Sequence, residues 1–165
     1  MKQTRALSLG VLSNEPVDQV ARMRRLKTRP QFQAALGGMT VSKTPRFALH
    51  ACALPSSTED GQAPLFAELA VWLGAMVPKR WAKRAVTRNA IKRQIYSVGQ
   101  EFAATLPVCA HVVRLRSAYD KSLFPSASSD ALRRTVREEL QLLFTRAVAQ
   151  ANAQANSAQA TPVSP

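Results

Sequence analysis

The spacing of hydrophobic residues predicts two long helices in the second half of the chain. Within 83–102 and within 128–149, large apolar side chains recur every three or four residues. This period places them on one side of a helix. The first stripe consists of Ile91, Ile95, Val98 and Phe102, and the second of Leu132, Val136, Leu140, Leu143 and Ala147. We expect both stripes to face a hydrophobic core.

Shorter apolar runs predict strands. The segments 39–43 and 46–54 are β-compatible and are joined through Thr44 and Pro45, which indicates an antiparallel pair. Residues 66–77 are long enough for a helix, but we favour a third strand there. Residues 108–115 are almost continuously apolar, as in a strand that is covered on both faces.

A short helix is expected before the first strand, with Thr28 as its N-cap and Pro30 in its first turn, and Gly37 stops it. The predicted order is helix, three strands, helix, strand, helix, which indicates a single α+β domain over 22–149. Residues 1–21 show no sustained period, so we expect a disordered extension. Residues 150–165 lack charge and large apolar groups, so we expect a disordered tail.

The charge balance points to a polyanionic partner. The 165 residues include 23 Lys and Arg against 10 Asp and Glu, a formal net charge of +13, which favours nucleic acid. No stretch approaches the roughly 20 apolar residues of a membrane span. The apolar run 6–12 lacks a signal-peptide cleavage site, and Cys52 and Cys109 are expected to be reduced core thiols. We therefore expect a cytoplasmic protein.

The positive charge is concentrated between residues 79 and 93, where seven of fifteen residues are basic and none is acidic. On a helix, Arg88, Asn89, Lys92 and Arg93 span roughly 140° of arc, away from Ile91. Arginine forks and lysine ammonium groups suit phosphate oxygens, and asparagine adds a donor and an acceptor. Such a surface can hold structured RNA through phosphates and 2′-hydroxyls. The alternative interpretation is a solvated basic helix face.

The same segment resembles the signature of the bacterial ribonuclease P protein family. The matching residues are Val77-Pro78-Lys79-Arg80, then Lys83-Arg84-Ala85, then Arg88-Asn89-Ala90-Ile91-Lys92-Arg93. Arg24-Arg25-Leu26-Lys27-Thr28 with Gln31-Phe32 is similar to the family's N-terminal basic segment and first helix, and Leu73-Gly74 to its third strand. The resemblance covers about 22–148. It departs from the family at Ala90, where an arginine is expected, at Pro78, and at Leu36, where an aromatic residue is frequent.

The resemblance implies an αβββαβα sandwich with a four-stranded sheet, like ribosomal protein S5 domain 2. It also implies that the chain binds the ribonuclease P RNA subunit and precursor tRNA, and assists the endonucleolytic cleavage that matures the tRNA 5′ end and leaves a 5′-phosphate. The RNA subunit would perform the chemistry with magnesium, while the protein binds no cofactor or metal and supplies no catalytic residue. No membrane and no obligate protein partner is implied.

Two groups of site residues follow from the resemblance. The RNA-binding group is Lys79, Arg80, Lys83, Arg84, Arg88, Asn89, Lys92 and Arg93, together with Arg24, Arg25 and Lys27. The second group, Phe32, Phe47 and His50, would line a cleft for the 5′ leader and stack on unpaired bases. The alternative interpretation of both phenylalanines is that they are core residues.

Two other functions remain open at this point. One is a structural RNA-binding protein of the ribosomal type, which would use the same basic surface. The other is a protein nuclease, which would need several converging carboxylates to bind metal. The ten acids are mostly spread over tails, loops and helix ends, and the adjacent pair Glu138 and Glu139 would point about 100° apart on a helix. This distribution disfavours the nuclease.

Overall fold

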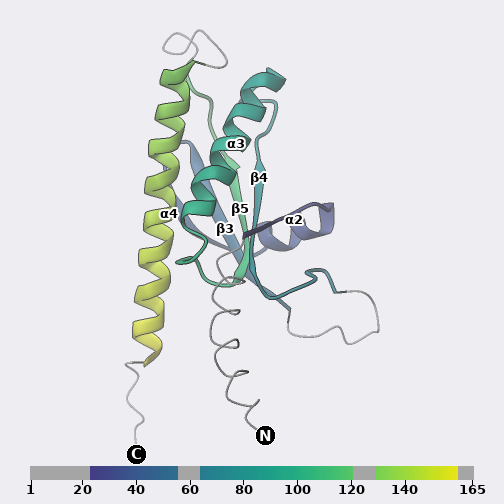
Figure 1. The fold of residues 1–165 in the computed structure, drawn as a ribbon, viewed down its shortest axis with the longest axis vertical. Helices are drawn as coiled ribbons and strands as arrows, with labels where there is room; N and C mark the ends of the chain where they lie inside the picture. The colour runs from purple at the N-terminus through teal and green to yellow at the C-terminus, as the bar shows by residue number, and fades with distance from the viewer. Residues whose placement is uncertain (1–22, 56–63, 121–128, 160–165) are drawn as a thin grey trace, which may run out of the picture.

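A mixed five-stranded sheet lies at the centre of the fold (Figure 1). The structure is a computed structural model and describes residues 23–55, 64–120 and 129–159. The strands are β1 (Met23–Arg25), β2 (Met39–Lys43), β3 (Phe47–Ala53), β4 (Val71–Met76) and β5 (Cys109–Leu115). Their spatial order is β1-β4-β5-β3-β2. The pairs β1–β4 and β4–β5 are parallel, whereas β3 pairs antiparallel with both β5 and β2.

Helices cover both faces of this sheet. Helix α2 (Arg29–Leu36) lies on one face, and α3 (Ala85–Glu101) and α4 (Asp130–Gln159) lie on the other (Figure 1). The larger core fills the space between the sheet and α3 and α4, and the predicted stripes of both helices are buried in it. A smaller core lies under α2. The molecule is therefore a three-layered α+β sandwich, as expected from the alternation of helical and strand periods.

Helix α2 begins and ends where local chemistry requires. The Thr28 hydroxyl accepts a hydrogen bond from the Gln31 backbone N–H at 3.4 Å, and the Gln31 side-chain oxygen accepts one from the Thr28 N–H at 3.2 Å. This reciprocal capping box satisfies donors that the helix itself leaves free. At the other end, Gly37 donates to the Gln33 carbonyl at 2.9 Å. The predicted cap at Thr28 and stop at Gly37 are confirmed.

Gly74 allows α2 to approach the sheet closely. A Cβ atom at this position in β4 would lie 2.6 Å from Phe32 Cε1 and 2.8 Å from Leu26 Cδ1. Both distances are shorter than real Cβ contacts, so the packing of Phe32 and Leu26 depends on a glycine here. The side chain of Phe32 is therefore held directly over the middle of β4.

Most of the predicted elements are confirmed, with three corrections. Strand β4 covers only Val71–Met76 of the predicted 66–77. The sheet has five strands, which differs in detail from the four-stranded, S5 domain 2-like arrangement that the resemblance implies, because Met23–Arg25 pairs with β4. The predicted tail is also partly wrong, since α4 continues ten residues past Ala149 to Gln159. Alanine and glutamine are good helix formers, and extending an existing helix requires no new nucleation. Residues 1–22 and 160–165 lie outside the described residues.

Candidate nucleic-acid interface

The predicted basic surface is formed by the turn after β4 and by the outer side of α3. Ile91, Ile95 and Val98 are at most 2% exposed and anchor α3 in the larger core. The opposite side of the helix therefore faces outward. Lys79, Arg80, Lys83, Arg84, Asn89 and Arg93 are exposed, and Arg88 and Lys92 are half-buried. All eight predicted residues of this segment thus lie on or beside one surface.

Arg88 also stabilises the turn that precedes its helix. Its Nη1 donates hydrogen bonds to the carbonyl oxygens of Lys83 at 2.7 Å and Ala82 at 3.1 Å. The Trp81 and Ala82 amides donate to the Pro78 carbonyl at 3.1 Å each, which closes the turn. Because a guanidinium has five N–H donors, three remain for phosphate oxygens. Arg88 therefore positions its basic neighbours as well as offering charge itself.

The N-terminal basic residues divide between the two faces of the sheet. The Arg25 guanidinium stacks on the ring of Tyr96 from α3, 4.1 Å from its centroid, which places Arg25 beside the basic helix. Arg24 pairs instead with Glu68 at 2.8 Å, and its strand partner Trp72 belongs to the α2-side core. Lys27 is exposed just before α2. The structure therefore brings Arg25, but not Arg24, next to the α3 surface.

Two of the three predicted leader residues share the face that α2 covers in part. Phe32 packs over Gly74, which is in register with Val112, and Val112 is in register with His50. Neighbours in register point to the same face. His50 therefore lies across the sheet from Phe32 on the α2 side, and both side chains are half-buried.

Phe47 corrects the prediction, because it lies on the opposite face. Its side chain is 0% exposed and belongs to the larger core with the residues of α3 and α4. Side chains alternate across a strand, so Phe47 and His50, three residues apart, must point to opposite faces. Phe47 has no surface on which a base could stack.

Two basic residues that the sequence prediction missed lie beside His50. Lys43 and Arg114 are both in register with Ala48, and Arg114 is also in register with Met76. This row crosses the α2 side of the sheet from β2 to Met76 at the end of β4, three residues before Lys79. The α2 side of the sheet therefore carries positive charge in addition to that of the turn and α3. Arg114 lies two residues after Val112 in the same strand, so the two side chains point to the same face, and this spacing could have revealed the orientation of Arg114. A single arginine in an otherwise apolar strand, however, did not indicate a binding residue.

The surroundings of His50 favour its neutral imidazole. Burial, and then the charges of Arg114 and Lys43, lower the pKa of His50 below its ordinary value. Its Nδ1 lies 3.1 Å from the Thr40 hydroxyl, and its Nε2 is buried without a hydrogen-bond partner among the described residues. A neutral, half-buried ring can stack on an unpaired base.

The described carboxylates are mostly occupied by arginines. Glu68, Glu101 and Asp130 pair with Arg24, Arg137 and Arg133 respectively. Within 23–55, 64–120 and 129–159, no three His, Cys, Asp or Glu side chains are arranged to hold a metal ion. None of the helices in these ranges is both long and apolar enough to cross a membrane. The acids thus contribute ion pairs to the fold.

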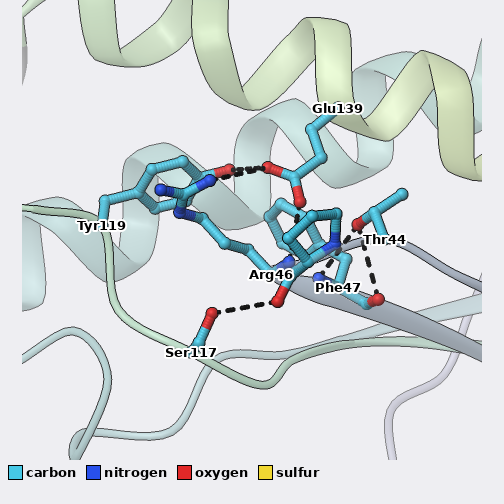
Figure 2. A network of polar contacts seen from close by, with 7 residues as sticks. Thr44, Arg46, Phe47, Ser117, Tyr119 and Glu139 are labelled. Atoms are coloured by element: carbon cyan, nitrogen blue, oxygen red, sulfur yellow. Dashed lines mark hydrogen bonds and ion pairs between the residues drawn. The ribbon is translucent and has the colours of Figure 1, made fainter.

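Glu139 has the most extensive of these interactions (Figure 2). Its carboxylate accepts hydrogen bonds from the Arg46 backbone N–H at 2.8 Å and from the Tyr119 hydroxyl at 2.9 Å. Burial and the neighbouring Glu139 raise the pKa of Tyr119 above its ordinary value. This network joins α4 to the turn between β2 and β3 and to the segment after β5.

Basic side chains on the turn after β4, on the outer side of α3 and on the α2 side of the sheet define the class of this protein, a nucleic-acid-binding α+β domain. Comparison with known proteins identifies its family. The model of the family described as Ribonuclease P matches residues 20–147. The chain belongs to the ribonuclease P protein family.

Relatives and solved structures agree with this assignment. The chain is 38% identical over 122 residues to the ribonuclease P protein component of Bordetella parapertussis, covering 74% of this chain and 89% of the relative. It is 35% identical over 123 residues to the protein component of Bordetella petrii, with the same coverage of each chain. The ribonuclease P protein of Staphylococcus aureus shares the fold, with a TM-score of 0.53 and 18% identity over 75% of this chain and 94% of that one.

Proposed function

We propose that this chain acts as the protein subunit of ribonuclease P in the 5′ maturation of tRNA. It binds the RNA subunit through the turn at 78–84 and the outer side of α3, where Arg88 fixes the turn and its neighbours contact phosphates. The observation that carries this proposal is the concentration of seven basic residues on one outward surface of a family member. Phosphate contacts of this kind dominate the affinity of proteins for nucleic acids.

The 5′ leader of precursor tRNA occupies the α2 side of the sheet in this proposal. Phe32 and His50 stack on unpaired bases, and Lys43 and Arg114 neutralise leader phosphates. The row from Lys43 to Met76 supports this arrangement, because it ends three residues before Lys79 in the basic turn. The positive charge on the sheet would then hold the substrate next to the RNA subunit.

The chemistry belongs to the RNA subunit, which requires magnesium, and the protein contributes binding and orientation. The pairing of Glu68, Glu101 and Asp130 with arginines supports this division, because metal-assisted hydrolysis needs converging carboxylates. The protein alone therefore leaves precursor tRNA uncut. We place this activity in the cytoplasm, with RNA as the partner and without an obligate protein partner.

A structural RNA-binding protein of the ribosomal type is the alternative, and competition binding separates the two functions. The labelled RNA subunit is bound to the protein at about 0.15 M salt and displaced by the unlabelled RNA subunit or by a ribosomal RNA fragment of equal length. Ribonuclease P function predicts that the ribosomal fragment competes at least tenfold more weakly. Equal competition would favour the ribosomal-type alternative.

A further inference from the structure

A hollow of about 340 Å³ separates the beginnings of α3 and α4. Its lining consists of Val86, Asn89, Ala90, Arg93 and Gln94 from α3 and Arg133 from α4. The side chain of Ala90 ends at Cβ, so the space between the two helices stays open beside it. The volume falls within the range of about 300–1,000 Å³ that is usual for small-ligand sites.

The lining offers both positive charge and hydrogen bonds. Arg93 and Arg133 reach the hollow from different helices, and the Arg133 side chain is 52% exposed. Gln94 adds a second amide side chain to the lining, beside that of Asn89. Val86 is 58% exposed, which is unusual for an apolar side chain in a basic surface. Two guanidinium groups, two amides and one apolar rim suit a phosphate with a sugar attached.

We propose that this hollow binds a backbone phosphate of RNA and its neighbouring ribose, with Arg93 and Arg133 on the phosphate and Asn89 and Gln94 on the 2′-hydroxyl. The proposal rests on the proposed function and extends it, because it assigns an RNA contact to α4. Arg93 and Asn89 belong to both surfaces, so the RNA backbone that α3 holds continues into the hollow. The RNA comes either from the RNA subunit or from precursor tRNA.

The ion pair between Arg133 and Asp130 is compatible with this role. The two side chains lie 3.6 Å apart and are 52% and 85% exposed. Exposed pairs of this kind contribute little stability, and the five donors of a guanidinium can serve a carboxylate and a phosphate together. The pair with Asp130 therefore does not by itself prevent Arg133 from contacting a phosphate.

Comparison of Arg133→Ala with Arg134→Ala tests the proposal. Both substitutions remove one positive charge from the same exposed stretch of α4, but Arg134 does not line the hollow. We expect Arg133→Ala to weaken RNA binding about tenfold, the loss of one charge-assisted contact. Its salt slope should fall by about 0.7–0.9 log units. Arg134→Ala should change affinity less than about twofold, because Arg134 does not line the hollow and an exposed charge without a direct contact is screened by salt.

Filling the hollow provides a second test without a change of charge. Ala90→Met keeps a good helix former but occupies the space beside Arg93, so it should weaken binding to a similar extent. Thermal melts followed by circular dichroism verify that each variant is folded. The proposal is overturned if Arg133→Ala matches Arg134→Ala, or if folded Ala90→Met binds like the wild type.

Two RNA probes identify the source of the phosphate. Affinity is measured for the RNA subunit alone, and then for precursor tRNA bound by the complete ribonucleoprotein. A loss on the first probe assigns the hollow to the RNA subunit, and a loss on the second alone assigns it to the substrate. If the wild-type protein fails to bind the RNA subunit, the proposed function fails. If the wild type binds and Arg133→Ala binds equally well on both probes, only the hollow fails.

Discussion

Removal of the Glu139 carboxylate should destabilise the fold strongly, because this group joins three segments that are distant in the sequence. The side chain of Glu139 is 11% exposed, and its two oxygens accept hydrogen bonds from the Arg46 backbone and the Tyr119 hydroxyl. The Arg46 guanidinium lies 3.8 Å from the same carboxylate and 4.6 Å from the centre of the Tyr119 ring. Figure 2 shows the three side chains converging between α4 and the turn before β3.

The size of the effect follows from these contacts. In Glu139→Ala the Arg46 N–H and the Tyr119 hydroxyl lose this acceptor, and the loss of each hydrogen bond to a charged, largely buried group costs about 1–3 kcal/mol. The ion pair adds less than about 1 kcal/mol, because Arg46 is 32% exposed. The expected loss is therefore about 3–5 kcal/mol, in the range for breaking a partly buried pair. It is a large part of a typical stability of about 5–15 kcal/mol.

Urea unfolding followed by circular dichroism measures this loss. With a slope of about 2 kcal/mol per molar urea, the midpoint should fall by about 1.5–2.5 M. Glu138→Ala is the matched control, since Glu138 is exposed on the same helix turn and should change stability by less than about 0.5 kcal/mol. The reasoning is refuted if the two alanine variants unfold within about 1 kcal/mol of each other at equal slope.

Three further predictions concern the site and the core. Lys92→Ala should reduce the salt slope of RNA-subunit binding by about 0.7–0.9 log units, and an unchanged slope would remove Lys92 from the interface. Gly74→Ala should lower stability by about 1–3 kcal/mol in a thermal melt, because the new methyl meets the Phe32 ring; wild-type stability would contradict the close packing. Burial lowers the pKa of His111 below 6.5, so its contribution to stability is present above pH 6.5 and is lost as the pH falls. When the pH falls from about 7.5 to 5, the free energy of unfolding measured in urea should therefore decrease more for the wild type than for His111→Gln. Equal decreases would show that folding does not lower the pKa of His111.

The elements with strong periodicity could be predicted from the sequence. Helix α3 begins at Ala85 and ends at Glu101, within two residues of the predicted bounds, because its apolar stripe is regular. Strand β2 spans the predicted residues 39–43. Strand β1 could not be predicted because three residues carry no readable period, and its parallel pairing with β4 depends on a contact far along the chain. The extension of α4 could not be predicted from composition, because an uncharged stretch rich in alanine and glutamine suits both a disordered tail and the end of a long helix.

The basic surface could be predicted because its residues are neighbours in the sequence. The α2 side of the sheet could be predicted only in part, because its residues come from different strands. Because side chains alternate along a strand, the spacing of three residues would have assigned Phe47 and His50 to opposite faces of the sheet. The spacing of two residues would have placed Arg114 on the same face as Val112. The hollow beside Ala90 depends on how α3 packs against α4, so no sequence pattern indicated Arg133 as a lining residue.

The single-turnover cleavage rate of precursor tRNA at low magnesium tests directly whether this chain assists the RNA subunit. Three reactions are compared: the protein alone, the RNA subunit alone, and the two together. We expect no cleavage by the protein, slow cleavage by the RNA, and a rate at least tenfold higher for the complex, with a product that begins at the mature 5′ end. Cleavage by the protein alone, or equal rates with and without it, would refute the proposed function.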